Sequence, residues 1–219
     1  MFPRLLLVVA AAVTAVAQAA PSCPAPRQVV ERFVPADCEA CWAEPGAALP
    51  GSTWVLDWIA PSPRGAEAAL AVAALAEAAE RLDALEAAPA AVSTQVFRWT
   101  VRARPGPALR VAGGPAWNGY LGLELTARGK PPAGAVAYLA LVEDVPAGSE
   151  GTAVARRLVR AVAGPLPLDA GGRVSTQLRA LRIPEGARAE RLRGAAWWVD
   201  GRQQLGGLAL EGCPGRPAP

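Results

Sequence analysis

Two cysteines separated by two residues are the part of this sequence whose residue types and spacing best fit a chemical reaction. Residues 38–41 read Cys-Glu-Ala-Cys and follow a short apolar run. A thiolate at the first cysteine can attack a disulfide, and the second thiol can then resolve the mixed disulfide. We predict Cys38 as the attacking group, with its pKa lowered by a helix N-terminus, and Cys41 as the resolving thiol. Asp37 and Glu39 act in the opposite direction, because nearby negative charge disfavours a thiolate.

The same pair has two other readings that the sequence leaves open. It can form an inert disulfide that ties a strand to a helix, or two thiolates that bind a metal with no other apparent ligand. The remaining cysteines, Cys23 and Cys213, lie near the two ends of the chain after residue 20. Four cysteines allow three pairings, of which we favour Cys38–Cys41 with a structural Cys23–Cys213 bridge.

Missing residue types exclude several kinds of chemistry. The sequence contains no histidine, and its single methionine is Met1. This excludes Ser–His and Cys–His nucleophilic pairs, histidine-ligated metals and methionine-rich copper sites. We predict no cofactor and no metal site. The formal net charge of +3 does not indicate a nucleic-acid-binding protein.

The N-terminus has the features of a secretory signal peptide. Arg4 precedes the apolar run 5–16, and residues 17–19 read Ala-Gln-Ala, a small-x-small cleavage site. We therefore predict a signal peptide over 1–19, a periplasmic or secreted protein, and no membrane span after cleavage. Acylation of Cys23 is disfavoured, because residues 20–22 read Ala-Pro-Ser, a poor match to a lipoprotein signal.

Four elements are predicted to position the cysteines. Residues 27–34 read as a buried strand, and a short helix opens at residues 37–38 and ends before Pro45. Residues 51–59 fit a second buried strand. A long helix is predicted from Ser62, as N-cap, to the residue before Pro89, since leucines recur on one side of it.

From residue 93 onward the pattern becomes that of an antiparallel β-sandwich. Apolar and polar residues alternate, with turn residues between the runs. The expected strands cover 97–103, 121–125, 136–142, 174–178, 195–199 and 205–210, with 152–163 favoured as a further strand. The run 136–142 is apolar on both faces and is expected to be central.

The residues around the cysteines resemble secreted bacterial thioredoxin-like proteins of unassigned function. The resemblance is carried by residues 29–33, Val-Val-Glu-Arg-Phe, running into Cys38–Cys41, and by residues 140–144 and 156–160 in the later half. It implies an α+β fold: a reduced thioredoxin-like domain over 20–92, an immunoglobulin-like antiparallel β-sandwich over 93–212, and a tail over 213–219.

The resemblance also implies thiol–disulfide exchange with a protein partner through Cys38 and Cys41. The proline that such enzymes place opposite the cysteines has no counterpart between residues 88 and 120. The alternative is a non-catalytic envelope binding or assembly module whose disulfides are structural. The sequence does not predict the partner, the direction of electron flow or the oligomeric state.

Aromatic and basic residues supply weaker candidate sites. Trp42, Trp54 and Trp58 fit an apolar wall around the cysteines or, more simply, core positions. The segment 117–120, Trp-Asn-Gly-Tyr, is expected in a loop, where it serves as a ligand platform or plugs the sandwich edge. A solvated face is favoured over an anionic-surface contact for a basic run of five arginines: Arg179, Arg182, Arg188, Arg191 and Arg193.

Overall fold

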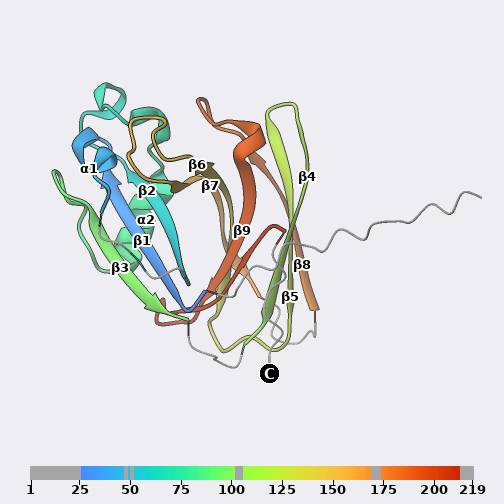
Figure 1. The fold of residues 1–219 in the computed structure, drawn as a ribbon. Coiled ribbons are helices and arrows are strands. Elements are labelled where there is room, and N and C mark those ends of the chain that lie inside the picture. The colour runs from blue at the N-terminus through green and yellow to red at the C-terminus, as the bar shows by residue number, and fades with distance from the viewer. Residues whose placement is uncertain (1–25, 47–48, 50–51, 102–105, 169–173, 213–219) are drawn as a thin grey trace, which may run out of the picture.

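Strands dominate the computed structural model, which describes residues 26–46, 49, 52–101, 106–168 and 174–212. Within these residues the chain forms ten strands in two sheets and two α-helices. The larger, mixed sheet contains in spatial order β10 (Leu205–Leu210), β9 (Leu192–Val199), β6 (Val136–Val145), β7 (Arg156–Pro167), β2 (Thr53–Ala60), β1 (Gln28–Pro35) and β3 (Gln95–Thr100). The smaller, antiparallel sheet contains β4 (Ala108–Trp117), β5 (Tyr120–Arg128) and β8 (Val174–Arg182) (Figure 1).

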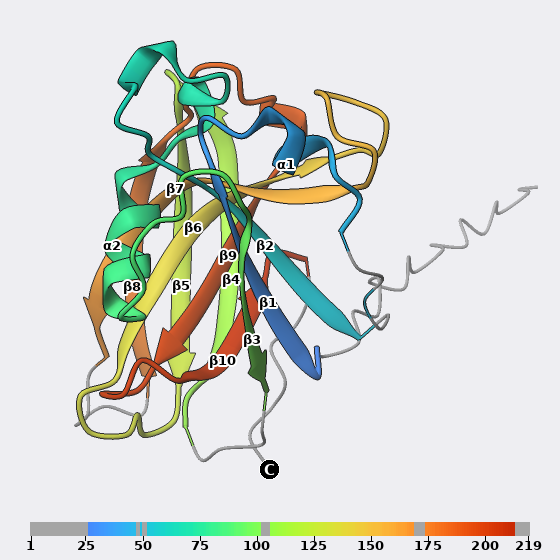
Figure 2. The same cartoon turned by 90° about the vertical axis from the view of Figure 1, so that its left-hand side faces the viewer.

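Two apolar cores lie on opposite faces of the larger sheet. One fills the space between the smaller sheet and β6, β9 and β10, and includes Leu123, Leu139 and Trp198. The other lies under helix α2 (Ala76–Ala84) and includes Phe33 and Trp197. Trp197 and Trp198 therefore point to opposite faces of β9, as the alternation of a strand requires. Figure 2 shows α2 lying along the strands and α1 (Glu39–Ala43) at one end of them.

The predicted fold class is wrong. A reduced thioredoxin-like α/β part followed by an immunoglobulin-like sandwich was expected, whereas the described chain is mostly β. Strands β1 and β2 do not form an α/β sheet of their own, because β2 pairs in parallel with β7 in the seven-stranded mixed sheet. Strand β3, expected in the sandwich, pairs instead with β1. Hydrophobic patterns predict strands but carry no information about these long-range partners.

The long helix predicted from Ser62 is also wrong. The chain there forms two short 3-10 turns, Gly65–Glu67 and Ala71–Ala73, and the α-helix begins only at Ala76. Gly65 has a φ of +56°, which is incompatible with a right-handed helix, and Ala74 forms a bridge with Ile59 of β2. The leucine spacing combines separate segments, because Leu70 packs in the cluster with Ile59 whereas Leu75 and Leu82 pack in the core under α2.

Several predicted strands are confirmed. The apolar run 136–142 lies in β6, which pairs with both β7 and β9, and the ambiguous segment 152–163 contributes to strand β7. The predicted signal peptide, Cys23, Cys213 and the tail lie outside the described residues.

Candidate functional site

Cys38 and Cys41 form a disulfide where β1 passes into α1. Cys38 is the N-cap of α1, and its Sγ accepts a hydrogen bond of 3.2 Å from the backbone N–H of Cys41. Cys38 is half-buried, whereas Cys41 is only 9% exposed. The helix is short, because Pro45 and Gly46 follow it and Gly46 has a φ of +68°. The predicted disulfide between these two residues is thus present.

The connection between α2 and β3 approaches the disulfide from the side. The carbonyl oxygen of Val92 lies 3.8 Å from Sγ of Cys38 and 3.7 Å from Sγ of Cys41. The side chain of Gln95 braces this connection, since it accepts from the N–H of Ala90 and donates to the carbonyl of Ala88, both at 2.9 Å. In a reduced protein the Val92 carbonyl is placed to accept an S–H group.

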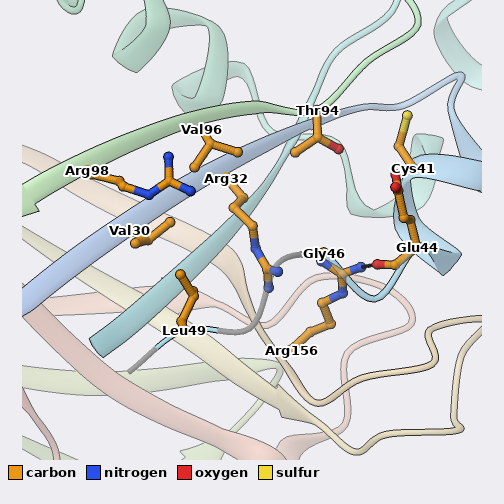
Figure 3. Close-up of a pocket in the computed structure, with 10 residues that line it drawn as sticks. All are labelled: Val30, Arg32, Cys41, Glu44, Gly46, Leu49, Thr94, Val96, Arg98 and Arg156. Atoms are coloured by element: carbon orange, nitrogen blue, oxygen red, sulfur yellow. Dashed lines mark hydrogen bonds between the residues drawn. The ribbon is translucent and has the colours of Figure 1, made fainter. Parts of the chain in front are cut away.

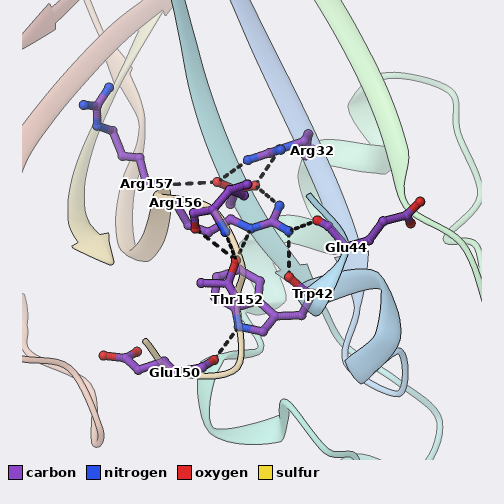
Figure 4. Close-up of polar contacts among 9 residues, drawn as sticks. Arg32, Trp42, Glu44, Glu150, Thr152, Arg156 and Arg157 are labelled. Atoms are coloured by element: carbon purple, nitrogen blue, oxygen red, sulfur yellow. Dashed lines mark hydrogen bonds and ion pairs between the residues drawn. The ribbon is translucent and has the colours of Figure 1, made fainter. Parts of the chain in front are cut away.

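Arg156 anchors the carboxyl end of α1 (Figure 4). Its Nη2 donates to the carbonyl oxygens of Trp42 and Glu44, both at 2.6 Å, and its Nε donates to the hydroxyl of Thr152 at 2.9 Å. The guanidinium also lies 4.9 Å from the centre of the Trp42 ring. The last carbonyls of a helix have no partner within it, so one buried guanidinium satisfies both.

A buried carboxylate fixes Arg156 in this position. Asp57 is fully buried, and its carboxylate accepts a hydrogen bond of 3.4 Å from Nη1 of Arg156. Arg32 donates from Nη2 to the same carboxylate at 2.9 Å, and its Nε lies 2.7 Å from the second oxygen. The backbone N–H of Arg157 adds a bond of 3.2 Å. Burial lowers the pKa of the Arg156 guanidinium, and the neighbouring Asp57 opposes that effect.

A pocket of about 210 Å³ opens beside the disulfide (Figure 3). Its apolar lining comes from Val30, Leu49 and Val96. Its polar and sulfur-containing lining is Arg32, Cys41, Glu44, Thr94, Arg98 and Arg156, and Gly46 also borders it. Cys41 therefore borders an arginine-lined pocket.

The negative charge of Asp37, next to Cys38, has partners of its own. The hydroxyl of Ser62 donates to its carboxylate, and Nη1 of Arg64 lies 3.7 Å from it. The negative charge that the sequence placed next to the cysteines is thus partly compensated by the segment that follows β2.

The predicted tryptophan wall forms only in part. Trp42 is buried in one cluster with Cys41, and its Nε1 donates to the carbonyl of Glu150 at 2.7 Å. Trp58 belongs to the core under α2, where it stacks on Phe33, and Trp54 packs at the edge of the same core.

The other two candidate surfaces lie away from the disulfide. Trp117 and Tyr120 flank the tight turn between β4 and β5, and Trp117 is 76% exposed. Part of the basic run is paired: Arg188 and Arg191 contact Glu150, and Arg193 contacts Asp144. The pairing favours a solvated face over an anionic-surface contact for these three arginines.

The sequence did not single out Asp57, Arg156, Val92 or Gln95. They lie from about 20 to more than 100 residues away from the cysteines along the chain, and no short motif connects them. A charged residue within the apolar run 54–59 was the one visible signal, because an ionised side chain in a buried strand requires a partner.

The described residues contain no group of three or more side chains suited to metal binding. In the same part of the chain, no helix is long and apolar enough to cross a membrane.

Comparison with known proteins gave no match to a family model, to a curated protein or to a solved structure. The resemblance to secreted thioredoxin-like proteins stays a prediction. The fold class that it implied, a reduced thioredoxin-like α/β part followed by a sandwich, is wrong for the described residues.

Proposed function

We propose that this protein exchanges disulfides with a protein partner through Cys38 and Cys41, in the periplasm or outside the cell. The observation that carries the proposal is the asymmetry of the pair: Cys38 is the more exposed sulfur and accepts the N–H of Cys41. A half-exposed first cysteine beside a buried second cysteine fits one attacking and one resolving group.

The oxidised protein starts the reaction. A substrate thiolate attacks Sγ of Cys38, the Cys38–Cys41 bond breaks, and the thiolate of Cys41 leaves with the electron pair. A second substrate thiolate then attacks the substrate sulfur of the mixed disulfide and releases Cys38 as a thiolate, which the N–H of Cys41 stabilises. The substrate is oxidised by two electrons, the protein is reduced by two, and the two substrate protons go to the new thiolates or to solvent.

The disulfide contributes little to holding α1 in place. A bridge across three positions closes a very short loop and is expected to stabilise the fold by about 2 kcal/mol in the chain-entropy treatment. Arg156 and Trp42 bind the same helix to β7 and its preceding loop through separate contacts. Reduction therefore leaves the site assembled, as a reversible exchange requires.

A thiol-trapping titration of the mature protein tests the proposal. The protein is equilibrated in redox buffers, alkylated and weighed by intact mass spectrometry, beside Cys38→Ser and a Cys23→Ser/Cys213→Ser double variant. We expect two thiols to appear at a potential between about −270 and −120 mV, in the wild type and in the double variant. The Cys38→Ser protein is expected to show no such transition.

Persistence of the Cys38–Cys41 bond below about −300 mV would contradict exchange. That result favours the rival reading, a binding or assembly module with structural disulfides. The nearly buried Cys41 and the Val92 carbonyl beside both sulfurs are the observations that favour the rival.

A further inference from the structure

The pocket beside the disulfide contains unused cationic groups. Arg156 has Nε, Nη1 and Nη2 all committed, to Thr152, Asp57 and the two carbonyls of α1. Arg32 commits only Nε and Nη2 to Asp57, so its Nη1 has no partner in the described part of the chain. Figure 3 shows Arg32 and Arg98 on the same side of the pocket.

Arg98 adds a positive charge that nothing described compensates. It lies on β3, is exposed, and makes no hydrogen bond or ion pair with the described residues. Three arginines line the pocket, against Glu44 at its wall and the buried Asp57 behind it. The pocket therefore carries a net positive charge and suits an anionic group.

Space is left at the free nitrogen of Arg32. A Cβ added at Gly46 would lie 3.3 Å from Nη1, so that glycine keeps this side of the guanidinium open. Val30, Leu49 and Val96 supply an apolar surface next to it, and Val96 is 39% exposed. This combination fits a side chain with an aliphatic stem and a carboxylate end.

Strand β3 offers a backbone edge along the same pocket. It is the last strand of the larger sheet, and on its outer edge no strand of the described residues pairs with it. Val96 and Arg98 on this strand line the pocket, and so does Thr94, the residue directly before it. An extended peptide can add to such an edge by backbone hydrogen bonds while its side chains enter the neighbouring pocket.

The length of this edge sets the spacing expected in the peptide. Thr94 and Arg98 are separated by about 13 Å in an extended strand. Cys41 borders the pocket near the Thr94 end in Figure 3. Side chains two or four positions apart point to the same face of an extended peptide. A peptide cysteine at the disulfide therefore places a carboxylate two or four residues away at Arg98.

We propose that the pocket binds an acidic, extended peptide segment of the substrate, with a carboxylate held between Arg98 and Nη1 of Arg32. The inference rests on the exchange function proposed above and names its substrate class: cysteines with an acidic residue two or four positions away.

Synthetic peptides that differ at one position test the substrate class. Each has one cysteine and, four residues from it, Glu, Gln or Lys, so that both side chains point to the same face of an extended peptide. The rate of mixed-disulfide formation is measured with the wild type, Arg98→Gln and the control Arg110→Gln, an exposed arginine on strand β4. We expect the Glu peptide to react at least about fivefold faster than the Gln peptide, and the Lys peptide to be slowest.

The two variants distinguish binding of the Glu side chain in the pocket from attraction of the peptide to the net positive charge of the protein. In Arg98→Gln the Glu peptide is expected to react no faster than the Gln peptide does with the same variant. In Arg110→Gln the preference is expected to persist. Equal losses in both variants would show attraction to the net charge alone and would overturn the proposal.

A measurement of peptide binding tests the pocket independently of disulfide exchange. Peptides with Ser in place of Cys are titrated into the oxidised protein and followed by anisotropy of a fluorescent label. A preference for Glu that depends on Arg98, without any exchange, would support the pocket and refute the exchange function. Equal binding and equal rates for Glu and Gln peptides would overturn the pocket and leave exchange intact.

Discussion

Arg156 is the residue on which the geometry around the cysteines most depends. It bonds a carboxylate, a hydroxyl and two helix carbonyls, and it lies over the Trp42 ring. A buried guanidinium is tolerated only when its donors and its charge are matched, as they are here. Burial lowers its pKa, but an arginine starts so far above neutral pH that it stays charged.

Replacement of this arginine tests whether it holds α1. Arg156→Met is expected to lower the free energy of unfolding by about 3 kcal/mol, because Asp57 loses one of its two charged partners and two helix carbonyls lose their donor. Urea unfolding of the oxidised protein measures the change. Arg193→Met, which breaks a pair whose arginine side chain is 55% exposed, is the control and is expected to cost less than about 1 kcal/mol. Similar losses in both variants would show that the network does not anchor the helix.

At this scale the sequence predicts the cysteines and not their surroundings. Cys-x-x-Cys is a local pattern, and the disulfide forms as expected. The Asp57 network joins residues 25 and 99 positions apart, for which no spacing rule exists. Only the fold places them together.

The hairpin of β9 and β10 shows how a single element is fitted to a large side chain. Trp198 is buried, and its Nε1 donates to the carbonyl of Pro107 at 3.2 Å. Gly206 and Gly207 of β10 lie directly against its ring. Glycine at these positions lets the strand approach the indole closely, and the register of the two strands shifts there.

A methyl group at Gly206 tests this fit. An added Cβ would lie 1.9 Å from the Trp198 ring, which its hydrogen bond and burial hold in place. We expect Gly206→Ala to destabilise the fold by about 2 kcal/mol or more through overpacking. Gly122→Ala on β5, where a Cβ meets nothing within 4 Å, is the matched control and is expected to change stability by less than about 1 kcal/mol. Equal melting temperatures for the two variants would contradict the expected overpacking.

Strands were predicted better than helices for a physical reason. Period-two alternation in the first half of β5 reflects one face on the core, with Leu121, Leu123 and Leu125 buried. In β8 the burial also alternates, but Val174 and Leu178 lie on the exposed face. The helical spacing after Ser62 instead combined residues from two 3-10 turns and α2, which contribute to different apolar clusters and do not form one helix. A backbone break at Gly65 is set by its local conformation, which residue spacing does not reveal.

At the scale of the molecule, the larger sheet joins early and late parts of the chain at a narrow junction. Strand β2 pairs with β7 at one register position, Asp57 opposite Leu158. The carboxylate of Asp57 binds the N–H of Arg157 and the side chain of Arg156 at the same place. Buried charge pairs therefore reinforce a junction that has few backbone hydrogen bonds.

This junction predicts one cooperative unit. The full mature chain is expected to unfold in urea in a single transition, with tryptophan fluorescence and far-ultraviolet circular dichroism coinciding. Fragments covering residues 20–101 and 106–219 are expected to lack cooperative transitions of their own, because each exposes an edge strand and half of the Asp57 network. A cooperative transition in the first fragment would instead mean that β1, β2 and β3 carry the cysteine site independently. In that case the charged network would be only a contact between two stable units, and Arg156→Met would shift one transition rather than the unfolding of the whole chain.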